Sequence, residues 1–74
     1  MTDGDLAQYV VSMAHDLRTP LTSIRGFADV LVRGADRLSD ENRLDYLERI
    51  KAAAASLDEM ITQLATTAGD AVPD

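Results

Sequence analysis

The chain has 74 residues and carries seven basic against thirteen acidic side chains, for a formal net charge of −6 at pH 7. The sequence has no basic patch of the kind that nucleic-acid binding needs, which excludes a nucleic-acid-binding protein. No stretch approaches the roughly 20 apolar residues of a membrane span, which excludes a membrane-spanning segment. With no cysteine and a single histidine, neither disulfides nor a metal site can stabilise so short a chain, which leaves self-association as its route to a core.

Residues 1–5 are expected to be a short leader without the features of a targeting segment. A helix is predicted over about residues 6–34, because apolar residues then recur at intervals of three and four and form one stripe. They are Leu6, Val10, Met13, Leu17, Leu21, Ile24, Ala28 and Leu31. Gly34 suits the left-handed position that often follows a helix C-terminus.

A second helix is predicted over about residues 40–66, after a short connection at residues 35–39. Ser39 is a good N-cap, and Asp40 and Glu41 add negative charge to the first turn. The apolar residues again follow a heptad-like spacing: Leu47, Ile50, Ala54, Leu57, Ile61 and Leu64. The pattern fades after Ala65, so residues 67–74 are predicted to form a disordered tail.

Two long helices joined by a short loop lie antiparallel, so the predicted fold is an all-α helical hairpin. Each apolar stripe is wide enough for more than one neighbour. We therefore expect a homodimer in which two hairpins form an antiparallel four-helix bundle. The alternative is a monomeric hairpin, which has little core for its size.

His15 is the most conspicuous candidate for chemistry. At 100° per residue it lies about 160° from Leu17, on the side of the helix away from the apolar stripe, so it is expected to be exposed. Thr19, Thr22 and Gly26 continue its face as a strip of polar or small residues that leaves room for a partner. The first alternative is a histidine buried in the core, but its position on the helical wheel argues against this. The second alternative is a solvated surface histidine without a role.

Pro20 interrupts the first helix one turn after the histidine. It has no N–H, so the carbonyl of Asp16 loses its helical partner and a kink is expected there. The apolar stripe stays in phase through Leu21 and Ile24, which favours one kinked helix. The alternative is a new helix that Thr19 caps, with Pro20 at its first position. A hinge beside a reactive residue suits a signalling switch.

The run from residue 12 to residue 27, SMAHDLRTPLTSIRGF, resembles the H-box of sensor histidine kinases. The resemblance continues more loosely through residues 46–50 and 57–64, and covers about residues 6–66. It implies the dimerisation and histidine-phosphotransfer domain of a two-component signalling kinase. The fold of that family, a helical hairpin that dimerises into a four-helix bundle, agrees with the periodicity.

The resemblance also implies roles for single residues. His15 takes the γ-phosphoryl of ATP, for which its ring must be neutral, as histidine mostly is at cytoplasmic pH. Asp16 accepts or orients the proton on the other ring nitrogen. The phosphoryl then passes to an aspartate on the receiver domain of a response regulator. Thr19 positions water for the reverse task, dephosphorylation of the regulator.

Four further residues are expected to contact the partner by the same resemblance: Arg18, Thr22, Gly26 and Phe27. The helical wheel supports Thr22 and Gly26, each about 20° from His15, better than Phe27. For Arg18 a surface ion pair is the alternative role.

The four glycines are too scattered to cradle phosphates, so the chain itself is expected to bind no cofactor or metal. ATP and magnesium belong to a separate ATP-binding domain, without which the hairpin does not autophosphorylate. The expected partners are a second copy, that ATP-binding domain and a receiver domain. The expected location is cytoplasmic, in a parent kinase anchored in the inner membrane. Whether phosphorylation occurs within or across protomers stays open.

Two other functions fit the pattern less well. A non-catalytic dimerising scaffold or signal-transmission hairpin needs none of His15, Asp16, Thr19 and Pro20. A free-standing phosphorelay protein usually forms its bundle within one longer chain.

Overall fold

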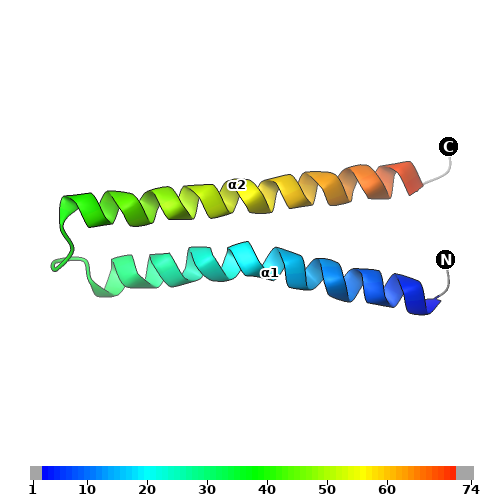
Figure 1. Cartoon of the computed structure of the whole chain (residues 1–74), viewed down its shortest axis with the longest axis horizontal. Helices are drawn as coiled ribbons and strands as arrows, with labels where there is room; N and C mark the ends of the chain where they lie inside the picture. The colour runs from blue at the N-terminus through cyan, green and yellow to red at the C-terminus, as the bar shows by residue number, and fades with distance from the viewer. Residues whose placement is uncertain (1–2, 72–74) are drawn as a thin grey trace.

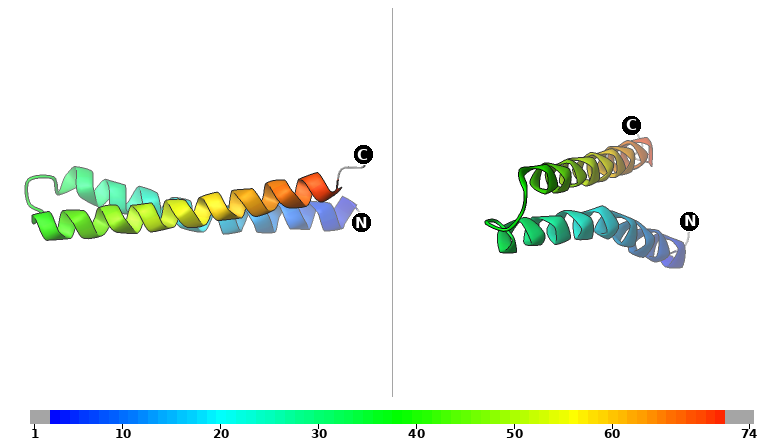
Figure 2. Two further views of the ribbon diagram at one scale, coloured as in Figure 1. Left: turned by 90° about the horizontal axis from the view of Figure 1, so that it is seen from above. Right: turned by 60° about the vertical axis from the view of Figure 1, so that its left-hand side comes forward.

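The computed structural model describes the backbone of residues 3–71 and the side chains of residues 3–66. It contains two helices, α1 (Asp3–Arg33) and α2 (Asp40–Ala71), joined by residues 34–39. The helices run antiparallel side by side, as Figures 1 and 2 show from three directions. The chain measures 53 × 23 × 12 Å, so it is one helix thick in its shortest direction. The predicted all-α hairpin is confirmed.

Both helices are longer than the sequence predicts. α1 begins at Asp3, so residues 3–5 of the expected leader are helical, and Asp3 and Asp5 favour the positive end of the helix dipole. α2 continues to Ala71, whereas the disordered tail was predicted from residue 67. The fading of the apolar period therefore does not mark the end of the helix. Residues 1–2 and 72–74 of the expected leader and tail lie outside the described residues.

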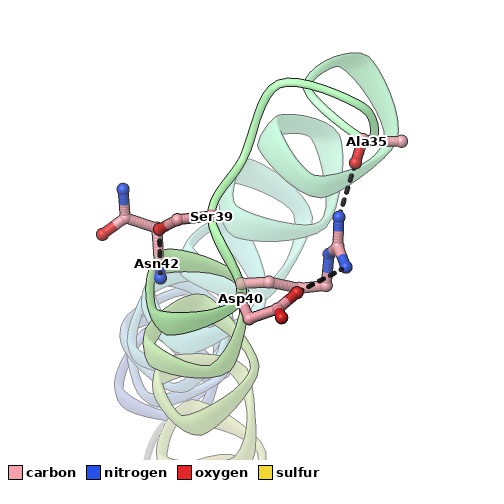
Figure 3. A network of polar contacts seen from close by, with 5 residues as sticks. Ala35, Ser39, Asp40 and Asn42 are labelled. Carbon is pink, nitrogen blue, oxygen red and sulfur yellow. Dashed lines mark hydrogen bonds and ion pairs between the residues drawn. The ribbon is translucent and has the colours of Figure 1, made fainter.

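Side-chain polar contacts tie residues 34–39 to the start of α2 (Figure 3). The Ser39 hydroxyl oxygen accepts a hydrogen bond from the backbone N–H of Asn42 at 3.1 Å, which confirms the predicted N-cap. The Arg43 guanidinium donates to the carbonyl of Ala35 at 2.6 Å and lies 3.5 Å from the Asp40 carboxylate. One arginine therefore holds the connection against the first turn of α2.

The prediction of a left-handed conformation at Gly34 is wrong, since no described residue has a positive φ. Its N–H donates to the carbonyl of Val30 at 2.9 Å, and its own carbonyl accepts from the N–H groups of Arg37 and Leu38. A Cβ at residue 34 would lie 3.1 Å from the Val30 carbonyl oxygen and 3.2 Å from Leu38 Cγ. Close packing therefore disfavours a side chain at residue 34.

The two helices meet along one face of each. Pro20 is the single buried residue among those described, and the other contact residues are half-buried. They include Met13, Leu17, Ile24, Phe27 and Leu31 on α1 and Tyr46, Ile50, Ala53, Leu57, Met60 and Leu64 on α2. This burial follows the predicted stripes only in part. Leu6, Val10, Leu21, Leu47, Ala54 and Ile61 belong to the same stripes but stay exposed.

α1 is one continuous helix through Pro20, so a new helix capped by Thr19 is excluded. The helix bends near its middle, in the cyan part of the right-hand view in Figure 2. The Thr19 hydroxyl donates to the carbonyl of His15 at 3.4 Å, a back-bond that often accompanies helix bending. The predicted kink therefore has two local causes, the missing N–H of Pro20 and the hydroxyl of the residue before it.

A second apolar face remains uncovered beside the contact between the helices. The side chains of Leu6, Val10, Leu47 and Ile61 are each about half exposed, at 53%, 56%, 48% and 49%. The total accessible surface is 6084 Å². A typical folded monomer of 8.0 kDa has about 4500 Å². The hairpin leaves apolar surface exposed that a compact monomer of its mass would cover.

Replacing Ser39 with alanine removes the acceptor for the Asn42 N–H, and we expect it to lower the free energy of unfolding by about 1 kcal/mol. Thermal and urea unfolding followed by circular dichroism measure this loss. Ser56→Ala, at an exposed interior position of α2, is the matched control and is expected to be neutral or slightly stabilising. Equal effects of the two variants would contradict the capping role.

Candidate functional site

His15 lies in the middle of α1, just before the bend, and its side chain is exposed as predicted. The half-buried residues Met13 and Leu17, which face α2, lie about 160° from it around the helix. The ring therefore points away from α2. In this position a second macromolecule can reach the imidazole without any movement of the helices.

The imidazole borders a shallow depression of about 340 Å³ on the outer surface of α1. Its lining residues are His15, Arg18, Thr19, Thr22 and Ser23. Apart from the imidazole and the guanidinium, the lining side chains are short, and the depression is open. The structure thus brings together four of the eight residues that the sequence singles out.

The carboxylate of Asp16 lies about 100° around the helix from His15, toward the side of α1 that meets α2. It is exposed and forms no hydrogen bond or ion pair with any described residue. By contrast, Asp29, Asp40 and Asp45 each pair with an arginine three or four residues away. Asp16 is therefore available to accept a proton or a hydrogen bond.

Thr19 presents its hydroxyl between His15 and Asp16. Because its proton is directed at the His15 carbonyl, its oxygen lone pairs remain free to accept a hydrogen bond. The same contact restricts the rotation of the side chain. A water molecule beside the imidazole would find a fixed acceptor here.

Gly26 lies on the exposed face two turns beyond Thr19. A Cβ built at this residue has no atom within 4 Å outside the local helix. Glycine in a helix interior costs about 0.5–1 kcal/mol relative to alanine, and no contact within the chain requires it here. The flat surface over Thr22 and Gly26 therefore has no explanation in the packing of the hairpin.

Phe27 and Arg18 differ from the strip formed by Thr22 and Gly26. Phe27 is half-buried against α2, where its ring stacks on Tyr46 with 5.8 Å between centroids and Arg49 lies 5.8 Å from the ring centre. This contact gives Phe27 a structural task within the hairpin. Arg18 forms no ion pair with any described residue, so its guanidinium is free for an anion.

A second concavity, of about 370 Å³, lies between the helices on the other side of Asp16. Met13, Asp16 and Thr19 line it from α1, and Met60 and Gln63 line it from α2. The motif of α1 gives no indication of the two α2 residues, because they lie outside it. The antiparallel register of the two stripes, which pairs residues near 13–16 with residues near 60–63, is the signal that brings them to the site.

No group of three or more metal-ligating side chains occurs among the described residues. Neither described helix is long and apolar enough to cross a membrane.

Comparison with known proteins identifies the class of this site. Residues 5–68 match the His Kinase A (phospho-acceptor) domain family, HisKA. The chain belongs to this family. It is a HisKA domain of the kind that two-component histidine kinases use for dimerisation and phosphoacceptance. In that family, ATP is bound by a separate kinase domain.

One curated relative is an uncharacterised sensor-like histidine kinase, ycf26, of Porphyra purpurea. It is 40% identical over 40 residues, which make up 54% of this chain and 6% of the relative. The HisKA domain thus spans only a small part of a much longer kinase-like protein. No solved structure matches the chain.

Replacing Gly26 with alanine is expected to raise the free energy of unfolding by about 0.5–1 kcal/mol, because the helix gains propensity and the added methyl meets open space. Urea unfolding of the isolated HisKA domain measures the gain. Gly34→Ala is the matched control: its methyl meets the Val30 carbonyl at 3.1 Å, so no gain is expected. Destabilisation by Gly26→Ala would reveal a close contact at residue 26 that the single hairpin does not contain.

Proposed function

We propose that His15 is the phosphoacceptor of a two-component sensor histidine kinase and that this hairpin relays phosphate between ATP and a response regulator. The observation that carries the proposal is the placement of its only histidine. The ring is exposed on an open depression, and the carboxylate on one flank and the arginine on the other form no ion pair with any described residue. In a chain of the HisKA phospho-acceptor family, this placement supports phosphoryl transfer to the histidine.

In the transfer step, the ring nitrogen of His15 that carries a lone pair attacks the γ-phosphorus of ATP. The N–P bond forms as the P–O bond to ADP breaks, and its electrons leave with ADP. Asp16 takes the proton from the other ring nitrogen, which raises the electron density on the attacking atom. The unpaired guanidinium of Arg18 balances negative charge on the incoming phosphoryl group. ATP and magnesium are held by a separate ATP-binding domain.

The phosphoryl group then passes to an aspartate of a receiver domain. HisKA domains in general engage response regulators, and the flat surface of Thr22 and Gly26 below His15 suits the approach of such a domain. The geometry of Thr19 supports a second activity, in which its free lone pairs hold the water that hydrolyses the phosphorylated regulator.

The functional unit in this proposal is a homodimer with a four-helix bundle. HisKA domains in general dimerise, and the exposed apolar face of Leu6, Val10, Leu47 and Ile61 supplies the surface. This face lies on the side of the hairpin away from Asp16 and Gln63. The bend at Pro20 lies within the bundle and serves as a hinge between signalling states.

The proposed reaction uses ATP, which is available in the cytoplasm. We therefore expect the domain to lie on the cytoplasmic side of the membrane. The matched part of the curated relative is a small fraction of its length, which leaves room for sensor and ATP-binding parts in a parent kinase anchored in the inner membrane.

His15→Gln is expected to abolish phosphorylation when the ATP-binding domain of the kinase is supplied, because the amide cannot act as the nucleophile. The measurement is incorporation of acid-labile, alkali-stable phosphate from labelled ATP. Gln8→Ala, at an exposed position two turns earlier on α1, is the control and is expected to retain phosphorylation. Label of this stability on the His15→Gln variant would reject the assignment.

Thr19→Ala is expected to slow dephosphorylation of the regulator by about tenfold or more while sparing His15 phosphorylation, since a mispositioned water loses much of its reactivity. Thr19→Ser keeps the hydroxyl and is expected to keep both activities. Rates of phosphate release from the purified phosphorylated regulator provide the comparison. Loss of both activities to the same extent in Thr19→Ala would contradict the division of roles.

Ile61→Asp is expected to dissociate the dimer, because it adds a charge to the apolar face that the second hairpin covers. Sedimentation equilibrium should give twice the chain mass of 8.0 kDa for the wild type and the single mass for the variant. Ser56→Asp adds the same charge on the opposite side of α2 and is expected to leave the dimer intact. A wild-type chain that sediments at 8.0 kDa at micromolar concentration would reject the dimer.

A further inference from the structure

The carboxylate of Asp16 lacks any partner that fixes its orientation. It is exposed and forms no contact with a charged or hydrogen-bonding group among the described residues. A proton acceptor works well only when it is held in hydrogen-bonding reach of the proton it takes. A group that donates a hydrogen bond to Asp16 would therefore have a direct effect on the reactivity of His15.

The α1 helix offers few donors to Asp16. Its neighbours three and four residues away are Ser12, Met13, Thr19 and Pro20. Met13 and Pro20 have no side-chain N–H or O–H, and the hydroxyl proton of Thr19 is directed at the His15 carbonyl. Ser12 alone remains on α1, and serine hydroxyls within a helix commonly bond to the helix's own carbonyls.

The other donor lies across the concavity between the helices. Asp16 forms part of its α1 wall, and Met60 and Gln63 form its α2 wall. Gln63 is the only one of the lining side chains with N–H groups to donate, and its amide carries two of them. A carboxylate accepts only, so the two side chains are complementary.

This concavity also stays open when the hairpins dimerise as proposed. Leu57 on α2 is half-buried and faces α1. From Leu57, Ile61 of the exposed apolar face lies about 40° around the helix in one direction, and Gln63 lies about 120° in the other. A second copy that covers Ile61 therefore leaves Gln63 beside Asp16.

We propose that Gln63 is a positioning residue of the phosphoacceptor site, whose side-chain amide donates to the Asp16 carboxylate and aims it at the His15 ring. The inference rests on the proposed function, in which Asp16 takes the ring proton. In the transfer step Gln63 forms and breaks no covalent bond. It holds Asp16 while the proton moves from the ring nitrogen to the carboxylate and the phosphoryl group moves from ATP to the other nitrogen.

Gln63→Met tests the donor, because methionine has a similar length and helix propensity but no N–H. The initial rate of His15 phosphorylation, at saturating concentrations of the kinase's ATP-binding domain, is expected to fall by about three- to tenfold. The half-saturating concentration of that domain should not change. Gln63→Lys restores an N–H donor and is expected to recover most of the rate. Glu48→Ala, at an exposed position about four turns earlier on α2 and out of reach of Gln63, is the matched control.

A double-mutant cycle with Asp16→Asn separates positioning from a general structural effect. If Gln63 acts through Asp16, Gln63→Met does not lower the phosphorylation rate further in the Asp16→Asn background. If Gln63→Met instead disturbs the structure in general, its loss of rate adds to that of Asp16→Asn. Ser12→Ala tests the remaining donor on α1 and is expected to leave the rate unchanged. Additive losses, or a loss with Ser12→Ala in place of Gln63→Met, would overturn the proposal.

The contact itself can be observed without phosphorylation. In the ¹⁵N spectrum of the full chain, the side-chain amide resonances of Gln63 are expected to move on Asp16→Asn substitution and to stay in place with Glu48→Ala. Amide resonances that do not respond to Asp16→Asn would overturn the contact. A wild-type chain that takes no phosphate at His15 would instead overturn the proposed function, and this result appears in a separate measurement.

Discussion

The shape of a two-helix hairpin governs the rest of this structure, because a layer one helix thick cannot enclose a core. Each helix therefore presents an inner face to the other helix, a second apolar face beside it, and an outer polar face. On α1, Leu17 and Ile24 form the first, Leu6 and Val10 the second, and His15 lies on the third. The ring of His15 is exposed because it lies on neither apolar face of α1. A bundle formed from two such hairpins would leave the same outer surface free.

The local backbone at the site follows from three consecutive residues. Pro20 removes the N–H that would bond to the Asp16 carbonyl, and Thr19 donates its hydroxyl to the His15 carbonyl. The bend and the fixed hydroxyl thus have a common origin one turn after the histidine. The same bond that directs the Thr19 proton into the helix leaves its lone pairs on the outside. A signal that changes the bend would therefore also move the group proposed to hold water.

Much of the fold can be predicted from the sequence, because apolar periodicity and the Ser39 cap depend on interactions between residues close together in the chain. The helices, their antiparallel order, the exposure of His15 and the bend at Pro20 all follow from helical geometry and backbone chemistry. The predicted ends were less accurate, since the backbone of α2 stays helical through residues 67–71, beyond the point where the apolar period fades. The conformation of Gly34 was predicted wrongly. What favours glycine there is the close approach of Leu38, and the sequence pattern does not reveal such a contact. Gln63 was missed for a similar reason: its approach to Asp16 depends on the register between two helices.

The distribution of charge also favours the His15 region as the place where phosphate is handled. The net charge of −6 makes the surface as a whole unfavourable for anions. Arg33, Arg43 and Arg49 are each engaged by an aspartate on the same helix, which neutralises much of their field. Arg18, Arg25, Arg37 and Lys51 form no ion pair with a described residue, and Arg18 is the one of these four that lines the same depression as the imidazole. A phosphoryl group on His15 would therefore have an unengaged cation beside it, although the net charge of the chain is negative. The opposite flank, where Asp16 and Gln63 share a concavity, remains available for the proton.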